Sequence, residues 1–352
     1  MRGFADTKYK NCLKNGTEQI CKGNIMNFLE AKKSFAALFQ NELSEWEARS
    51  LLTTLYENGE NEEEIAAAAT VMRSHSVRLN VPLELQSEII DIVGTGGDKS
   101  KSINISSTAA IILASLGCYV AKHGNRAITS NSGSADMLEA IGINLSLPVE
   151  GQIKMLEETN FTFMFAINHH PAMSYIMPIR RSIPHPTIFN IIGPLCNPAG
   201  AKKGLIGVLN PALNIKIANA LKLLNSISVL VVSSNDGMDE ISVSAVTKAA
   251  MLKNDKVTEF EIDPQNYGIK LSSKQEVVGG DAVQNAKIAL DTLTNKEKGA
   301  KRDIVFLNAA FTLLLDNKAR DIKEGLEMAK MAVESGKAKA KLDEIIKFSR
   351  MF

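Results

Sequence analysis

The sequence predicts an α/β fold, with a small all-helical N-terminal domain and a larger, doubly wound, mainly parallel sheet domain flanked by helices. Short apolar runs alternate with helical segments from Ile89 onward, which is the pattern of a parallel sheet. Residues 27–80 read as helices, and capping boxes begin at Ser44 and Asn61. With 352 residues, 45% of them hydrophobic, the chain can bury the cores of two domains.

Composition and charge exclude several classes of protein. Lys and Arg (40) nearly balance Asp and Glu (39), so the net charge of +1 provides no broad basic face. No apolar run has transmembrane length, and the first 26 residues lack the apolar core of a signal peptide. Four scattered cysteines without metal-ligand spacing are typical of reduced thiols. We therefore expect a cytoplasmic protein that binds neither nucleic acid nor membranes.

The first candidate site follows an expected strand at residues 89–93. The loop 94–98, Gly-Thr-Gly-Gly-Asp, lets the backbone turn sharply and approach a ligand. Residues 102–108 then supply hydroxyls and an amide where a helix begins, and such a helix N-terminus favours anions. Asp98 would repel phosphate and suits a sugar hydroxyl, a cation or an amide. The loop matches neither the Rossmann nor the Walker pattern, so a turn without a ligand is the alternative.

A second candidate loop follows an expected strand at residues 118–121. Residues 122–126, Lys-His-Gly-Asn-Arg, provide two cations, an imidazole and an amide, and four hydroxyl side chains follow before a helix at 135–140. Two such loops after neighbouring strands lie where open α/β sheets bind ligands. The alternatives are a solvated basic loop for Lys122 and Arg126, and a structural histidine at His123.

The third candidate segment is an acidic turn, residues 235–240, directly after an expected strand at 228–232. Asp236, Asp239 and Glu240 surround a turn glycine. Mg²⁺ prefers one or two protein carboxylates together with substrate phosphates and water. An ordinary Asx/Gly turn is the alternative. Taken together, the three segments predict a site for a polyphosphorylated substrate whose pyrophosphate must be neutralised.

Nine motifs, in matching order, resemble the anthranilate phosphoribosyltransferase family, which is related to the nucleoside phosphorylases (glycosyltransferase family 3). They are residues 94–98, 104–107, 122–126, 132–136, 170–173, 178–181, 187–195, 197–199 and 236–240. The resemblance runs from about Asn27 to near the C-terminus, and the combination is specific although each glycine loop alone is not. Two departures are Pro186, where the family usually has arginine, and Asn131, where it often has lysine.

The resemblance implies transfer of the 5-phosphoribosyl group from phosphoribosyl pyrophosphate (PRPP) to the amine of anthranilate, with release of pyrophosphate, in tryptophan biosynthesis. It also implies two Mg²⁺ ions and a homodimer formed through the helical domain. Loss of pyrophosphate from C1 of ribose passes through an oxocarbenium-like state. We therefore expect Mg²⁺-assisted catalysis without a covalent nucleophile. A pyrimidine nucleoside phosphorylase and a non-catalytic nucleic-acid-binding relative are the alternatives.

The resemblance further implies roles for individual residues. PRPP would be bound by Gly94, Gly97, Asp98, Ser102, Asn104, Ile105, Ser106, Ser107, Lys122, His123, Gly124, Asn125, Arg126, Ala127, Ile128, Thr129, Ser130 and Ser134. Anthranilate would be bound by Gly94, Asn125 and Arg180, whose guanidinium is the natural partner of its carboxylate. Mg²⁺ would be held by Ser106, Asp239 and Glu240.

The resemblance also divides the chain. Residues 1–25 lie outside it and are expected to form a polar N-terminal extension. Residues 26–88 would form the helical domain, joined by a segment near 168–184. Residues 89–167 and 185–352 would form the α/β, PRPP-binding domain.

Overall fold

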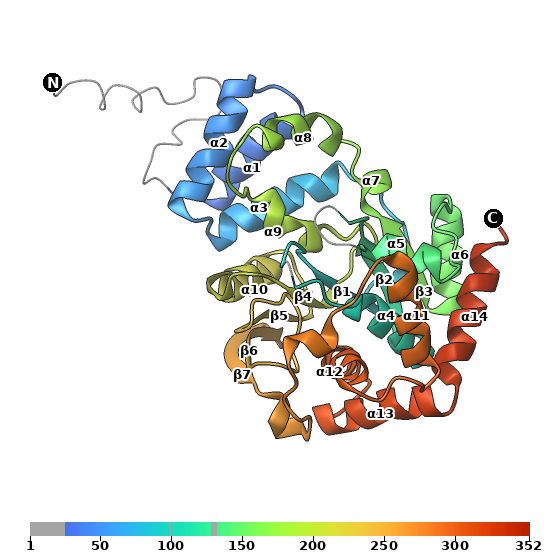
Figure 1. Cartoon of the computed structure of the whole chain (residues 1–352). Helices are drawn as coiled ribbons and strands as arrows, with labels where there is room; N and C mark the ends of the chain where they lie inside the picture. The colour runs from blue at the N-terminus through green and yellow to red at the C-terminus, as the bar shows by residue number, and fades with distance from the viewer. Residues whose placement is uncertain (1–24, 99, 128–131) are drawn as a thin grey trace.

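The computed structural model describes residues 25–98, 100–127 and 132–352 (Figure 1). The extension predicted for residues 1–25 therefore lies outside the described residues except for Ile25. The N-terminal helices are α1 (Phe28–Phe39), α2 (Glu45–Asn58) and α3 (Glu62–Ser74). Each begins with a capping box, which confirms the two boxes expected at Ser44 and Asn61 and adds a third at Asn27.

In the described part of the chain, seven strands form one sheet in the order β3-β2-β1-β4-β5-β6-β7. The strands are β1 (Ile89–Gly94), β2 (Tyr119–Gly124), β3 (Phe161–Phe165), β4 (Lys203–Gly207), β5 (Ser228–Ser234), β6 (Thr247–Lys253) and β7 (Lys256–Ile262). The first five are parallel, and β6 and β7 add an antiparallel edge. The predicted mainly parallel sheet is confirmed.

The strand order reverses at β1. From β1 the chain winds outward through β2 to β3, and it then returns to the other side of β1 to form β4 and β5. β1 and β4 run side by side to their last residues, where Gly94 pairs with Gly207. Open α/β sheets bind ligands outside the carboxyl ends of the strands at such a reversal. The fold therefore places the predicted loops at a natural ligand site.

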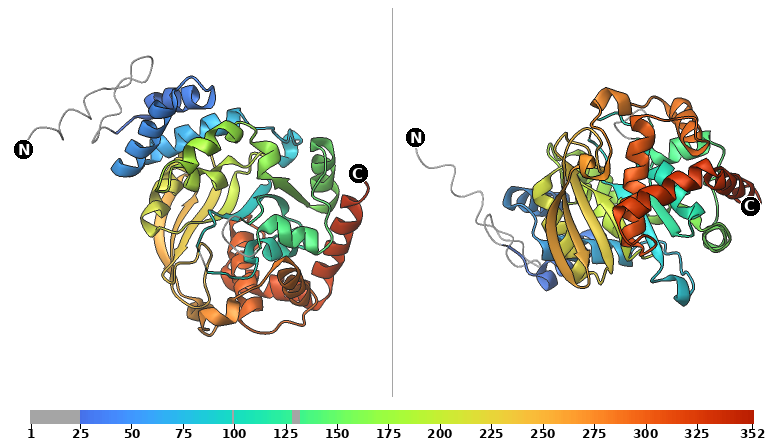
Figure 2. Two further views of the ribbon diagram at one scale, coloured as in Figure 1. Left: turned by 45° about the horizontal axis from the view of Figure 1, so that its top comes forward. Right: turned by 90° about the horizontal axis from the view of Figure 1, so that it is seen from below.

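Helices cover both faces of the sheet (Figure 2). The helices after the N-terminal three are α4 (Ile105–Ser115), α5 (Ser134–Ala140), α6 (Val149–Thr159), α7 (Ala166–His169), α8 (Met173–Arg181), α9 (Phe189–Ile192), α10 (Asn214–Leu223), α11 (Ala282–Leu293), α12 (Ala300–Leu315), α13 (Ile322–Glu334) and α14 (Lys337–Ser349). Short 3₁₀ turns lie at Leu83–Leu85, Gly193–Cys196, Pro211–Leu213, Pro264–Tyr267 and Lys274–Val277. None of the helices in the described residues is long and apolar enough to cross a membrane.

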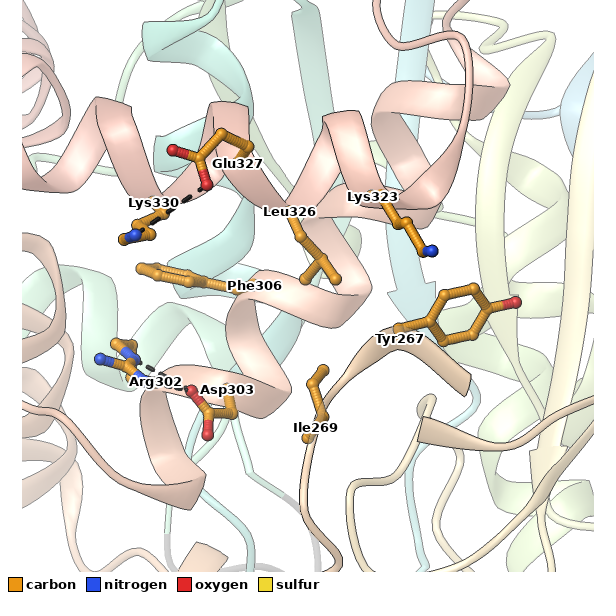
Figure 3. Close-up of a pocket in the computed structure, with 9 residues that line it drawn as sticks. All are labelled: Tyr267, Ile269, Arg302, Asp303, Phe306, Lys323, Leu326, Glu327 and Lys330. Carbon is orange, nitrogen blue, oxygen red and sulfur yellow. Dashed lines mark hydrogen bonds and ion pairs between the residues drawn. The ribbon is translucent and has the colours of Figure 1, made fainter. Parts of the chain in front are cut away.

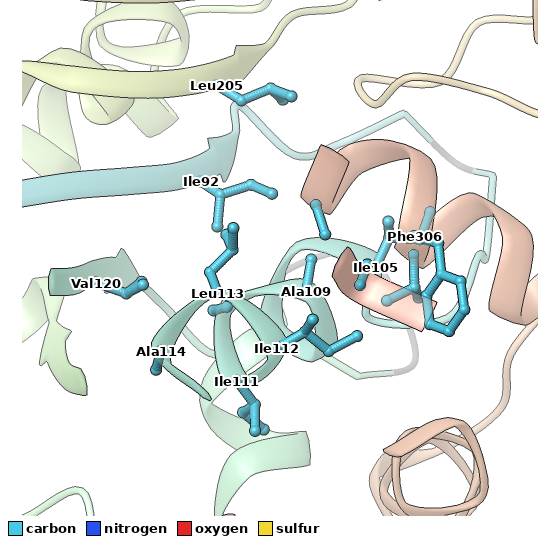
Figure 4. Packing of buried hydrophobic residues seen from close by; sticks show 14 of the residues in the cluster. Ile92, Ile105, Ala109, Ile111, Ile112, Leu113, Ala114, Val120, Leu205 and Phe306 are labelled. Atoms are coloured by element: carbon cyan, nitrogen blue, oxygen red, sulfur yellow. The ribbon is translucent and has the colours of Figure 1, made fainter. Parts of the chain in front are cut away.

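The larger apolar core lies between the sheet and α4, α11, α12, α13 and α14. Figure 4 shows Ile92 and Leu205 of the sheet facing Leu113 of α4, with Phe306 of α12 nearby. α4 is apolar on almost every side and is buried along nearly its whole length. A helix that is hydrophobic all round must be covered on all sides, which explains why the C-terminal helices pack over it.

A second apolar core joins the other face of the sheet to the helical domain. Phe35 of α1, Ile176 of α8 and Val231 of β5 belong to this one cluster of buried side chains. α8 packs on α2, and α10 packs on α3. Part of the segment near 168–184 thus contacts the N-terminal helices, while the division of the chain into domains stays a prediction.

The structure corrects the boundary of the second candidate loop. β2 was expected to end at Ala121, but it continues to Gly124, which pairs with Phe165 of β3. Lys122 and His123 are therefore buried strand residues and not loop residues. The pairing with β3 extends the strand past the point where the apolar sequence ends.

Candidate active site

The glycine-rich loop after β1 lies against the acidic turn after β5. The Gly96 N–H donates to Oδ2 of Asp239 at 2.7 Å. A Cβ atom at Gly94 would overlap the same carboxylate, and one at Gly207 would overlap the Asp239 carbonyl oxygen. Gly96 (φ 71°) and Gly97 (φ 82°) have left-handed backbones, which glycine adopts without a steric penalty. The sequence of this loop therefore permits a close approach between two segments 143 residues apart.

Asp239 and Glu240 are both buried, at 7% and 8% exposure. Burial raises the pKa of both carboxyls, and the negative charge of Asp98 in the glycine-rich loop raises them further. Oε2 of Glu240 is buried without a hydrogen-bond partner. A buried carboxylate oxygen without a partner, beside a second carboxylate, is a favourable position for a cation.

Lys122 connects three parts of the site. Its buried Nζ donates to the Ile92 carbonyl oxygen at 2.6 Å and to Oγ of Ser106 at 3.2 Å. Burial lowers the pKa of Lys122, while the negative charges of Asp91 and Glu240 raise it. The Lys122 ammonium group therefore lies beside both the start of α4 and the acidic turn.

The donor set fits Mg²⁺ that is shared with a phosphate. Among residues 25–98, 100–127 and 132–352, no group of three or more His, Cys, Asp or Glu side chains could hold a metal ion. Mg²⁺ does not need such a group, because it usually takes one or two protein carboxylates and completes its shell with phosphates and water. Asp239, Glu240 with its unpartnered Oε2, and the Ser106 hydroxyl match that requirement.

The start of α4 presents polar groups beside these carboxylates. Asn104 precedes the helix, but its side chain makes no capping hydrogen bond. Ile105 begins the helix and is buried, and the Ser107 hydroxyl is buried without a partner. Ser102 forms an isolated antiparallel β-bridge with Val278. In the first helical turn the Ile105 N–H donates to the Ile103 carbonyl oxygen at 2.8 Å, and the Ser106 N–H donates to the Glu240 carboxylate, so the start of α4 is tied to the acidic turn. A helix N-terminus also favours anions through its dipole.

Beyond β2, the second loop folds back onto α5. Arg126 forms ion pairs with Asp136 at 3.0 Å and Glu139 at 2.6 Å, and its guanidinium lies over the Phe165 ring. Oδ2 of Asp136 accepts hydrogen bonds from the N–H groups of Ala127 and Gly133, each at 2.9 Å. Thus Arg126 holds the loop to α5 in this structure.

Other predicted residues of this loop are only partly described. The Ser134 hydroxyl donates to the Asn125 carbonyl oxygen at 3.2 Å, directly beside Gly124. Ile128, Thr129, Ser130 and Asn131 lie outside the described residues.

Arg180 belongs to the helical side of the molecule. Its Nη2 donates to Oδ1 of Asn190 at 3.4 Å, and its guanidinium lies 5.4 Å from the centre of the Phe189 ring. Burial lowers the pKa of Arg180. Nearby, His185 stacks on Tyr56 of α2 at 4.1 Å, which defines the chain path beside the unusual Pro186.

Sequence reasoning missed several buried polar groups behind the site. Asp91 lies inside β1, where burial raises its pKa to about 6, and Nδ2 of Asn197 donates to its Oδ2 at 2.8 Å. Asn308 of α12 accepts from the Ile241 N–H at 3.1 Å and donates to the Ile241 carbonyl oxygen at 2.8 Å, next to Glu240. A carboxyl or amide within a buried apolar run was the available signal, because such groups must find partners.

A cavity of about 390 Å³ lies away from these segments, between the 267–269 turn, α12 and α13 (Figure 3). It is lined by Tyr267, Ile269, Arg302, Asp303, Phe306, Lys323, Leu326, Glu327 and Lys330. None of these residues was predicted to belong to the site.

Both domains match one known family. Residues 17–76 match the helical bundle domain of the glycosyl transferase family, and residues 86–339 match the α/β domain of that family. The fold and the site therefore define a glycosyl transferase.

Individual relatives identify the branch of that family. The chain is 43% identical to an anthranilate phosphoribosyltransferase of Paraburkholderia phymatum over 90% of this chain and 91% of the relative. The crystal structure of the Thermus thermophilus anthranilate phosphoribosyltransferase superposes with a TM-score of 0.87 at 36% identity, covering 93% and 97% of the two chains. The Saccharomyces cerevisiae enzyme, in complex with PRPP and Mg, has a TM-score of 0.83 at 26% identity, covering 93% and 94%. The chain belongs to the anthranilate phosphoribosyltransferase family, and neither alternative function is favoured.

The histidines at the edge of the site make stability depend on pH. The rings of His123 and His170 lie 5.1 Å apart, and burial lowers their pKa values from 6.5 to about 3 and about 4. Between these values and 6.5 the unfolded chain binds protons that the folded chain does not bind. The free energy of unfolding contributed by each histidine therefore falls as the pH drops below 6.5.

We predict that His170→Gln reduces this loss of stability. Relative to the parent protein, the variant should gain up to about 1.4 kcal/mol per pH unit as the pH falls from 6.5 to 4.5. Urea denaturation of both proteins at several pH values measures the difference, which cancels the titration of the other groups. A constant difference across this range would contradict the prediction.

Proposed function

We propose that the three segments at the carboxyl ends of β1, β2 and β5 form the site where the 5-phosphoribosyl group passes from PRPP to the amine of anthranilate, with release of pyrophosphate. The observation that carries this proposal is the hydrogen bond between Gly96 and Asp239, beside the unpartnered Oε2 of Glu240. It brings a Gly-rich anion loop and a pair of cation-binding carboxylates within reach of one ligand. The yeast relative in complex with PRPP and Mg supports this assignment.

The PRPP-binding residues would come from two loops and one helix. Gly94, Gly97, Asp98 and Ser102 would face the ribose and pyrophosphate, and residues 104–107 would present the N-terminus of α4 to the pyrophosphate. The segment from Lys122 to Ser130, with Ser134, would hold the phosphates. The convergence of Lys122, Ser106 and Glu240 supports this arrangement.

Ser106, Asp239 and Glu240 would hold two Mg²⁺ ions. The bound metal supplies charge neutralisation for the departing pyrophosphate. Burial, together with the negative charges of neighbouring carboxyls, raises the pKa values of Asp239 and Glu240, so positive charge is favoured at this place.

The chain's own residues would act by positioning and electrostatics. The ammonium of Lys122 is fixed by two hydrogen bonds, so it stabilises negative charge at one place without reorganisation during the reaction. The aromatic amine of anthranilate is neutral at pH 7 and needs no strong base. Orientation of the amine opposite C1 of ribose would therefore supply much of the rate acceleration.

Gly94, Asn125 and Arg180 would bind anthranilate. The Arg180 guanidinium donates to Asn190 at 3.4 Å and to the sulfur of Met177 at 3.5 Å, so most of its five N–H donors remain for a carboxylate. The partial burial of Arg180 would strengthen that ion pair relative to one in open water.

We predict that Asp239→Asn combined with Glu240→Gln lowers kcat/KM at least about a hundredfold at ordinary Mg²⁺ concentrations, because the pyrophosphate loses its metal ions. Loss of anthranilate fluorescence in the presence of PRPP and Mg²⁺ measures turnover. Asp236→Asn is the matched control, since the Asp236 carboxylate accepts from the Met238 N–H and the Ser242 hydroxyl, and its bond from Lys274 goes to the backbone carbonyl, which the substitution keeps. Unchanged kcat/KM in the double variant would refute the metal assignment.

We predict that Arg180→Ala raises the KM for anthranilate by about ten- to a hundredfold, which corresponds to the loss of a hydrogen bond between charged groups. The KM for PRPP should change much less. The adjacent, exposed Arg181 provides the control substitution Arg181→Ala. A larger effect of Arg180→Ala on PRPP than on anthranilate would contradict its role.

We propose that the protein forms a homodimer through the helical domain. Leu29 of α1 and Trp46 of α2 are 68% and 60% exposed there, and large apolar side chains on one domain favour association. Leu29→Glu combined with Trp46→Glu should shift the protein from dimer to monomer in sedimentation velocity. Met331 of α13 is 59% exposed outside the helical domain, and Met331→Glu should leave the dimer intact. A parent protein that sediments as a monomer would contradict the proposal.

A further inference from the structure

Asn285 of α11 reaches across the molecule to the predicted PRPP site. Its side chain is 3% exposed, and its Nδ2 donates to Oδ1 of Asn104 at 2.9 Å. The two residues are 181 positions apart. No residue of α11 was predicted to belong to the site.

A chain of hydrogen bonds determines the orientation of both amides. The Gly280 N–H can only donate, and it donates to Oδ1 of Asn285 at 2.8 Å. The Nδ2 group of Asn285 must therefore face Asn104, which leaves Oδ1 of Asn104 as the acceptor. The Ser132 hydroxyl donates to the same oxygen at 3.3 Å. With its oxygen occupied in this way, Asn104 directs one N–H of its Nδ2 group to the Ser132 carbonyl oxygen at 3.4 Å and has its second N–H left as the donor for an anion.

The segment before α11 also holds the backbone that leads to Asn104. The Gly279 N–H donates to the Lys101 carbonyl oxygen at 2.8 Å, and the Ile103 N–H donates to the Val277 carbonyl oxygen at 3.0 Å. A Cβ atom at Gly279 would overlap Oδ1 of Asn285, so glycine leaves the space that the amide occupies. The backbone that leads to Asn104 and the Asn104 side chain are therefore both held by the segment 277–285.

We propose that Asn285 is a positioning residue for the diphosphate of PRPP. It fixes the amide of Asn104 so that an N–H group, and not the carbonyl oxygen, faces the substrate. A reversed amide would direct a partial negative charge at the diphosphate. The inference rests on the proposed function, in which Asn104 binds pyrophosphate.

The test is a double-mutant cycle between Asn104 and Asn285. Asn285→Ala should raise the KM for PRPP about tenfold, the effect of losing one hydrogen bond to a charged ligand, and change the KM for anthranilate less than twofold. Asn104→Ala should raise the KM for PRPP at least as much. Combining them should add less than twofold to the effect of Asn104→Ala. Gln284→Ala, the exposed neighbour on α11, is the matched control and should match the parent protein.

A second variant keeps the test decisive if Asn285→Ala does not fold. Asn285→Asp has the same shape and still accepts from Gly280, but it has no donor for Asn104. It should raise the KM for PRPP in the parent protein and have less than a twofold effect beside Asn104→Ala. If the new carboxylate instead acted directly on PRPP, Asn285→Asp would raise the KM for PRPP both in the parent protein and beside Asn104→Ala. That result would contradict the positioning role.

The outcomes separate the two levels of the proposal. Effects of Asn104 and Asn285 that multiply independently would overturn the positioning role of Asn285 and leave the assignment of Asn104 intact. An Asn104→Ala variant with unchanged KM for PRPP would overturn the assignment of Asn104 and, with it, the positioning role. A lower thermal midpoint for Asn285→Ala with unchanged KM values would show a purely structural role.

Discussion

The contact between the Gly96 N–H and the Asp239 carboxylate is the constraint on which the site depends. It holds an acidic turn against a loop whose shape suits anions. Groups that favour cations and groups that favour anions therefore face the same space. Burying Asp239 and Glu240 side by side is costly in itself, since like charges in a poorly solvated site repel each other. A divalent cation bound at the proposed site would remove that cost. Relief of this electrostatic repulsion would then contribute to the proposed binding of metal and diphosphate.

Such a site needs support from the rest of the fold. Gly94 and Gly207 allow the turn to approach because they lack a Cβ atom, and glycine contributes little packing of its own. The apolar body of α4 and the helices over it provide the stability, while Asn308 satisfies the backbone of Ile241 next to the carboxylates. Buried amides that pair with backbone groups hold the acidic turn without adding charge.

The sequence was sufficient for elements whose signals are local. α2 and α3 begin at the capping boxes expected at Ser44 and Asn61, because each box is formed by residues only three positions apart. The extension of β2 through Lys122 could not be predicted, because it depends on pairing with β3. The link between Asn285 and Asn104 joins residues far apart in sequence, and only the packed fold brings them together. The family resemblance, carried by local motifs, predicted the site residues but not the amides that orient them.

Lys122 and Arg126, which look alike as cations in the sequence, are held in different ways. Lys122 is buried and tied to Ile92 and Ser106, so moving it would leave buried groups without partners. Arg126 is 46% exposed, and its ion pairs with Asp136 and Glu139 are of the surface kind, worth about 0–1 kcal/mol. Breaking them costs little compared with an ion pair between a guanidinium and a phosphate. In the proposed site Lys122 would therefore provide a fixed charge, whereas Arg126 could leave α5 to bind a phosphate at little energetic cost.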